Sequence, residues 1–149
     1  MFASVPPPAG APDGPPAAMP AHVPARRALL VDDEQVILLA LQRFFTRQGW
    51  AVDAAEDGAT ALDLLLGPGA AAYDVILTDL RMPGLRGEEL YARVAAARPE
   101  LTRRVIVSTG DSLSPEVTDF LRRTAVPVLN KPFELSELRA LVSQVTGAA

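Results

Sequence analysis

Short apolar runs alternate with longer stretches of helical periodicity along most of the chain. The runs are rich in valine, isoleucine and leucine and predict strands at residues 28–31, 50–54, 75–77, 105–107 and 126–129. The stretches between them predict helices at residues 34–48, 58–66, 87–97, 115–124 and 135–145. Five strands that alternate with five helices indicate an α/β protein with a parallel sheet covered by helices on both faces.

Local features agree with this pattern. Most of the predicted strands are almost wholly apolar, as strands that are buried on both faces should be. The helix at 115–124 has a clear start, because Ser114 can cap it and Pro115 and Glu116 suit its first turn.

The first 25 residues differ from the rest of the chain. They hold eight of the fourteen prolines together with many alanines, and they include His22, the single histidine. Proline removes backbone donors and alanine offers little surface to bury, so this stretch is predicted to be an extended or disordered tail or linker. The predicted domain then covers residues 26–146, and residues 147–149 form a C-terminal tail.

Composition narrows the function classes. The 149 residues suffice for one domain, and the absence of cysteine excludes disulfides, thiolate zinc sites and cysteine nucleophiles. The net charge of -4, without a block of lysine or arginine, argues against direct nucleic-acid binding. No apolar run reaches the roughly eighteen residues of a membrane span, and the N-terminus does not resemble a signal peptide. We therefore expect a cytoplasmic protein without a membrane partner.

Polar residues follow four of the five predicted strands. They are Asp32-Asp33-Glu34, Thr78-Asp79, Ser108-Thr109-Gly110-Asp111 and Asn130-Lys131-Pro132. Parallel strands bring their C-terminal ends to one edge of the sheet, where ligands bind in open α/β folds. Carboxylates, a hydroxyl and an ammonium should therefore meet at this edge.

That combination suits phosphoryl chemistry. Crowded carboxylates need a cation between them, and Mg2+ prefers oxygen ligands from one or two carboxylates and a phosphate. One aspartate could attack phosphorus, since aspartyl phosphates are known covalent intermediates. Lys131 and Thr109 could then hold the transferred oxygens.

These motifs resemble the receiver domains of bacterial response regulators. The resemblance rests on Leu30-Val31-Asp32-Asp33, on the run from Asp74 to Gly84, on Thr109 and on Lys131-Pro132-Phe133. Each motif alone is weakly specific, but all four occur in order at strand ends, and together they cover about residues 27–146. The resemblance implies a flavodoxin-like, doubly wound sheet with strand order 2-1-3-4-5.

The family's site residues map onto this chain one by one. The resemblance makes Asp79 the phosphorylated residue. It makes Asp32 and Asp33 the acidic pair that holds Mg2+, with Asp33 the more direct ligand. Asp79 and the backbone carbonyl of Arg81 complete the implied protein ligands.

The remaining positions concern the response to phosphorylation. The resemblance makes Thr109 the hydroxyl residue that moves toward the phosphoryl group and Lys131 the lysine that pairs with it. It also implies a cis bond between Lys131 and Pro132. Many receivers have an aromatic residue three positions before the lysine, whereas this chain has Val128. Any switch must therefore act through backbone or helix shifts.

Arg81 and Asp111 form a second hypothesis. They lie two residues after Asp79 and two after Thr109, positions that in this family flank the route of the hydrolytic water. We expect them to form an exposed pair that slows loss of the phosphoryl group.

The resemblance implies a signalling switch that takes its phosphoryl group from a sensor histidine kinase or histidine phosphotransfer protein and binds an unknown output protein. It would be no enzyme toward other substrates and would catalyse only its own Mg2+-dependent phosphorylation and dephosphorylation. With no output domain after the last predicted helix, we expect a stand-alone receiver or the terminal receiver of a larger protein such as a hybrid histidine kinase. The fourth helix, fifth strand and fifth helix are the family's usual homodimer surface.

Two other classes of protein are alternatives to a phosphorylated receiver. A pseudo-receiver that only docks a partner usually lacks an acid or the lysine, and this sequence has all of them. A phosphatase of the haloacid dehalogenase type needs Asp-x-Asp after the first strand, where this chain has Asp32-Asp33-Glu34. A phosphate-binding glycine loop of the Walker kind is also absent.

Overall fold

The computed structural model describes residues 25–110 and 114–147. Its elements, in chain order, are β1 (Arg27–Val31), α1 (Gln35–Arg47), β2 (Ala51–Ala55), α2 (Gly58–Leu66), β3 (Val75–Asp79), α3 (Gly87–Ala97), the 3₁₀ helix η3 (Pro99–Arg104), β4 (Val105–Thr109), α4 (Pro115–Thr124), β5 (Val128–Asn130) and α5 (Leu135–Thr146). The five strands form one parallel sheet of order β2-β1-β3-β4-β5, as the resemblance implied.

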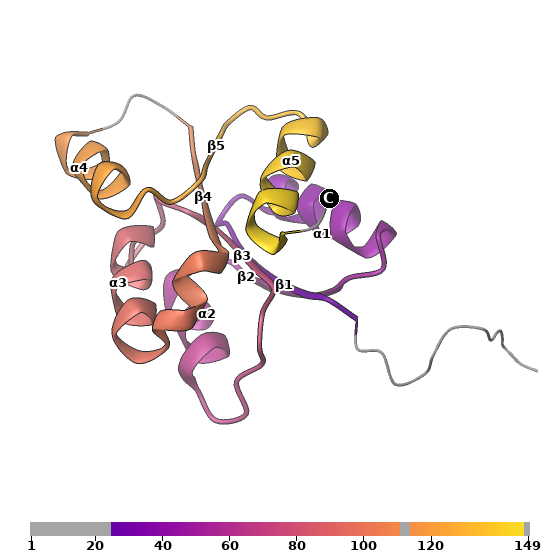
Figure 1. Ribbon diagram of the computed structural model, residues 1–149, viewed down its shortest axis with the longest axis horizontal. Coiled ribbons are helices and arrows are strands. Elements are labelled where there is room, and N and C mark those ends of the chain that lie inside the picture. The colour runs from indigo at the N-terminus through magenta and orange to yellow at the C-terminus, as the bar shows by residue number, and fades with distance from the viewer. Residues whose placement is uncertain (1–24, 111–113, 148–149) are drawn as a thin grey trace, which may run out of the picture.

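The sheet lies between two layers of helices (Figure 1). On one face α2, α3 and α4 pack over Leu29, Ile76 and Val107. On the other face α1 and α5 pack over Leu30, Leu77 and Ile106. Residues next to each other in a strand point to opposite faces, so continuous apolar runs fill both cores at once.

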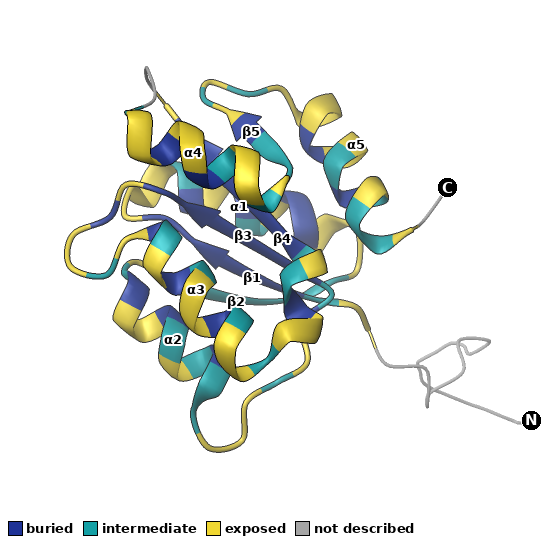
Figure 2. Ribbon diagram, turned by 60° about the vertical axis from the view of Figure 1, so that its left-hand side comes forward, coloured by how far each residue is buried: buried dark blue, intermediate teal, exposed yellow. Residues whose placement is uncertain are grey.

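The central strands are the most deeply buried part of the molecule (Figure 2). All five residues of β3 and all five of β4 are buried, whereas β2, at the edge, is mostly half-buried. This gradient confirms that the apolar runs mark strands covered on both faces. It also gives the residues that follow β1 and β3 a rigid base.

Two details differ from the sequence prediction. The fifth strand was expected at residues 126–129, but β5 covers only Val128–Asn130. Pro127 has no N–H for the strand ladder, although its carbonyl still accepts from the Val107 amide. The 3₁₀ helix η3 was not expected, because its six residues are too few for a helical period to show.

Other expectations have different outcomes. Ser114 caps α4 as predicted, accepting a hydrogen bond from the Val117 amide at 3.2 Å. No described helix has the length and apolar character needed to cross a bilayer. Residues 1–24, which include His22, lie outside the described residues, so the expected tail stays a prediction.

Candidate functional site

The site lies at the edge of the sheet where β1, β3, β4 and β5 end. Asp32 and Asp33 follow β1, Asp79 is the last residue of β3, and Lys131 follows β5. Register places Asp79 beside Ser108, so Thr109 extends one residue farther along β4. The strand order reverses between β1 and β3, and such switch points are where open α/β sheets bind ligands.

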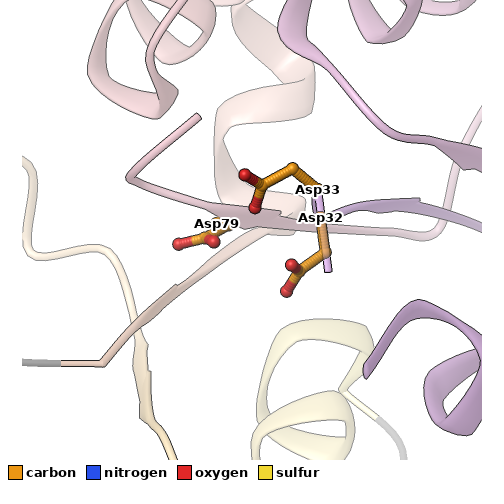
Figure 3. Close-up of side chains that lie close together, drawn as sticks. All are labelled: Asp32, Asp33 and Asp79. Atoms are coloured by element: carbon orange, nitrogen blue, oxygen red, sulfur yellow. The ribbon is translucent and has the colours of Figure 1, made fainter. Parts of the chain in front are cut away.

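Three carboxylates gather at this edge. Oxygen atoms of Asp32, Asp33 and Asp79 all lie within 4.8 Å of one another. Figure 3 shows the carboxylates of Asp32 and Asp33 leaving the backbone in different directions while both remain beside Asp79. Asp32 and Asp79 are only 1% and 5% exposed, whereas Asp33 is exposed. The cluster therefore has a buried floor and one carboxylate open to solvent.

The ammonium of Lys131, which follows β5, contacts this cluster of carboxylates. Its Nζ lies 2.8 Å from Asp32 Oδ2, 3.1 Å from Glu34 Oε1 and 3.2 Å from Asp79 Oδ2. Burial alone would lower the pKa of Lys131, but hydrogen bonding to carboxylates and the charges of Asp79 and Asp32 outweigh it and raise that pKa above its ordinary value. The ammonium is therefore charged over the whole physiological pH range.

Neighbouring groups act in opposite directions on the pKa of Asp79. Burial raises the pKa of its carboxyl above the ordinary value, and the charge of Asp32 adds to this rise. The Arg81 amide, which donates to Asp79 Oδ1 at 3.2 Å, and the Lys131 ammonium lower the pKa without cancelling the rise. A carboxyl group whose pKa is shifted by burial and by neighbouring charges is typical of a functional site.

Asp32 shows whether the site suits a cation. Its Oδ1 accepts a hydrogen bond from the Glu34 amide at 2.9 Å, so the side chain is held in place. Its Oδ2 is buried and pairs with the Lys131 ammonium at 2.8 Å, and it has no other donor among the described residues. A buried carboxylate oxygen of this kind, beside two more carboxylates, is the hard-oxygen environment that Mg2+ prefers.

A shallow cleft opens beside the cluster, lined by Asp33, Arg81, Met82, Pro83 and Arg86. Arg81 is exposed at this cleft, as predicted for a residue at the site entrance. Asp111, its predicted partner, lies outside the described residues, so the proposed pair stays a prediction.

The C-terminal side of the site follows the expected pattern. Thr109 is buried at the end of β4, and its carbonyl accepts from the Lys131 amide at 2.8 Å. The bond between Lys131 and Pro132 is cis, as predicted. Val128 is half-buried and packs against the core that α2, α3 and α4 share.

Sequence reasoning missed one contact. Glu34 was noted as part of the acidic strand end but was given no role of its own, yet its carboxylate touches Lys131. Its position directly after the acidic pair was the only sequence feature that pointed to it.

Comparison with known proteins gives this geometry a family. The sequence pattern described as response regulator receiver domain matches residues 28–143. The chain belongs to this family. The receiver fold, the strand order and the acidic cluster follow the pattern that the motifs implied.

Relatives support the same assignment. The response regulator MprA of Mycolicibacterium vanbaalenii is 34% identical over 124 residues, which make up 80% of this chain and 52% of MprA. The virulence sensor protein BvgS of Bordetella pertussis is 32% identical over 145 residues, or 91% of this chain and 12% of BvgS. This receiver thus spans about half or less of the curated relatives that it matches.

Among solved structures, a response regulator receiver protein from Pseudomonas putida is 27% identical with a TM-score of 0.70, covering 82% of this chain and 98% of that one. Receiver domains act between kinases and output domains, and the relatives include both a sensor protein and a response regulator. The chain is therefore a receiver domain, consistent with phosphoryl-accepting signalling.

Proposed function

We propose that this receiver accepts a phosphoryl group on Asp79 in a Mg2+-dependent reaction. The observation that carries the proposal is the position of Asp79, whose carboxylate lies 3.2 Å from the Lys131 ammonium and beside the carboxylates of Asp32 and Asp33. The donor is a sensor histidine kinase or a histidine phosphotransfer protein, as expected for the family. The reaction takes place in the cytoplasm.

The residues divide the chemistry among them. A carboxylate oxygen of Asp79 bonds to the phosphorus of phosphohistidine, the phosphorus–nitrogen bond breaks, and the donor nitrogen keeps the electron pair. Lys131 offsets charge on the transferred oxygens, and Thr109 offers a hydroxyl donor. Asp32, Asp33, Asp79 and the Arg81 carbonyl would hold Mg2+, which supplies further positive charge for those oxygens.

Phosphorylation then shifts a surface that a partner binds. Thr109 and the segment 114–133 adjust to the new charge and bias a two-state equilibrium. Val128 has no ring to rotate, so the shift is carried by the backbone or by helices. The output protein is unknown, and α4, β5 and α5 are the candidate homodimer surface. The domain turns over no other substrate.

The decisive experiment is intact mass after incubation with acetyl phosphate and Mg2+. We expect one added phosphoryl group in the wild type and none in Asp79→Asn or without Mg2+. Asparagine keeps the shape of the side chain but is not a nucleophile, so it isolates the chemistry. A folded, Mg2+-binding wild type that gains no mass from acetyl phosphate or from a histidine kinase would favour a pseudo-receiver that only docks a partner.

A further inference from the structure

The ammonium of Lys131 carries three protons, and three carboxylates approach it. The proposed function assigns roles to two of them, Asp32 and Asp79. The third, Glu34, accepts a hydrogen bond from Lys131 Nζ at 3.1 Å across 97 positions of sequence. Its side chain is 60% exposed, whereas that of Lys131 is 11% exposed. The contact therefore joins a solvent-facing acid to the largely buried cation of the site.

Local structure does not explain this contact. Glu34 occupies the N-cap position of α1, but its side chain makes no capping hydrogen bond. Its backbone amide is held by Asp32 Oδ1, which fixes where the side chain starts. The carboxylate thus extends from a fixed point at the end of β1 toward the end of β5, and not toward its own helix.

A phosphoryl group on Asp79 needs the same ammonium. The incoming phosphoryl oxygens are negatively charged, and Lys131 is the cation that contacts Asp79 among the described residues. While Glu34 accepts a hydrogen bond from Lys131, it adds one negative charge to the site and engages one of the three ammonium protons. A donor with two negative charges is repelled more strongly than a donor with one.

We propose that Glu34 is a positioning residue that restrains Lys131 and sets the rate at which Asp79 accepts phosphoryl groups from anionic donors. This inference rests on the proposed function. The phosphoryl group must displace Glu34 from Lys131, and the exposed Glu34 side chain can turn into solvent without leaving a buried charge. Glu34 is then an electrostatic gate at the site mouth, and not a ligand of the phosphoryl group.

The chain supplies a matched control for the charge. Glu56 follows β2 at the same edge of the sheet and is exposed. Its carboxylate oxygens lie 3.4 Å from the side-chain nitrogen Nε2 of Gln35. Glu34→Gln and Glu56→Gln remove the same charge from the same edge, but only the first removes a carboxylate from Lys131. Comparing them separates the contact from the general field of the surface.

The test follows the initial rate of mass gain with subsaturating donor and saturating Mg2+. At about pH 7 acetyl phosphate is a dianion, and phosphoramidate carries one negative charge less. With acetyl phosphate we expect Glu34→Gln to react about three- to tenfold faster than the wild type, with a smaller gain for phosphoramidate and a much smaller gain at about 1 M salt. Glu56→Gln should stay within about twofold of the wild type.

The experiment distinguishes failure of the role of Glu34 from failure of Asp79 phosphorylation itself. A wild type that is phosphorylated on Asp79 at the same rate as Glu34→Gln overturns the gate and leaves the receiver chemistry intact. An equal gain in Glu56→Gln also overturns it, because the contact with Lys131 would then be irrelevant. Equal gains with both donors overturn it as well, because the rate would then not depend on the charge of the donor. The absence of any adduct in all variants overturns both.

Discussion

At the scale of single residues, the entrance to the acidic cluster has an exposed arginine whose role can be tested. Arg81 is exposed beside Asp79 and lines the shallow cleft with Asp33 and Arg86. Its backbone amide donates to Asp79 Oδ1 at 3.2 Å, and the side chain of Arg81 faces solvent at this cleft. The family resemblance implies that water reaches a phosphorylated Asp79 along this side.

We predict that Arg81→Ala and Asp111→Ala both lose the phosphoryl group several-fold faster than the wild type. Each removes one member of the expected pair across the water route. The measurement is the first-order decay of phosphorylated protein after the donor is removed. Arg86→Ala, which removes another arginine that lines the cleft, serves as control and should decay at the wild-type rate. Wild-type decay rates of the phosphorylated protein in both Arg81→Ala and Asp111→Ala would contradict the hypothesis that the pair slows hydrolysis.

Tyr73 belongs to a different part of the molecule, beside the first residues of β1 and β3. Its buried hydroxyl donates to Asp53 Oδ2 at 2.7 Å, and the guanidinium of Arg27 contacts the same oxygen at 3.1 Å. Burial, followed by the bond to Asp53 and its charge, raises the pKa of Tyr73 above its usual value near 10. The folded chain thus holds the phenol proton more tightly than the unfolded chain does.

This difference sets the sign of an alkaline effect. The stability linked to the Tyr73 proton is fully present below about pH 10 and is lost as pH rises above that value. Tyr73→Phe should lower the free energy of unfolding by about 1 kcal/mol at neutral pH, because the hydrogen bond is lost. It should then lose less stability than the wild type at alkaline pH. Urea unfolding at several pH values measures both, and Tyr91→Phe, which keeps Tyr73, should follow the wild type.

At the scale of elements, the start of α3 packs directly against the backbone of Asp79. Gly87 opens this helix, and its amide donates to the Leu80 carbonyl at 3.2 Å. A Cβ at Gly87 would lie 2.7 Å from the Asp79 carbonyl oxygen and 2.8 Å from Leu80 Cα. Only glycine lets the helix approach so closely, and the closeness ties the position of α3 to that of Asp79.

Gly87→Ala should therefore destabilise the fold by about 1–3 kcal/mol, since backbone atoms must move to admit the methyl group. It should also slow phosphorylation of Asp79, whose backbone shifts with Leu80. Gly110→Ala is the control, because a Cβ there meets no atom within 4 Å and no strained backbone angle is present. Denaturant unfolding and the rate of mass gain give the two readouts; equal stability of both variants would contradict the packing argument.

At the scale of the whole molecule, folding itself gathers the carboxylates. Asp32, Asp33 and Asp79 come together only when β1 and β3 pair, so the unfolded chain has no comparable cation site. A ligand that binds only the folded state raises its stability by mass action. Cation binding and the stability of the entire sheet are therefore linked.

We predict that Mg2+ at about 100 times its dissociation constant raises the free energy of unfolding by about 2.7 kcal/mol. Asp33→Asn should lose most of this gain, and its exposed position should leave the metal-free fold intact. Thermal unfolding with and without MgCl2 measures the shift. NaCl at equal ionic strength is the control for screening. The same shift in NaCl, or in Asp33→Asn, would argue against a metal held by these carboxylates.

The sequence by itself determined the architecture and the membership of the site. Apolar runs such as residues 75–77 and 105–107 predicted strands buried on both faces, and parallel pairing then placed Asp32, Asp79 and Lys131 at one edge. These conclusions follow from periodicity and from a rule of sheet geometry, both of which are readable along the chain. The cis bond before Pro132 came from the family resemblance.

Only the tertiary structure decided how the site residues share their contacts. Asp32 is buried and Asp33 is exposed although they are neighbours, because successive residues leave the end of β1 in different directions. Glu34 meets Lys131, and α3 lies against Asp79, through packing between segments far apart in sequence. Such contacts depend on how side chains and helices fill space together, and no local pattern of residues encodes them.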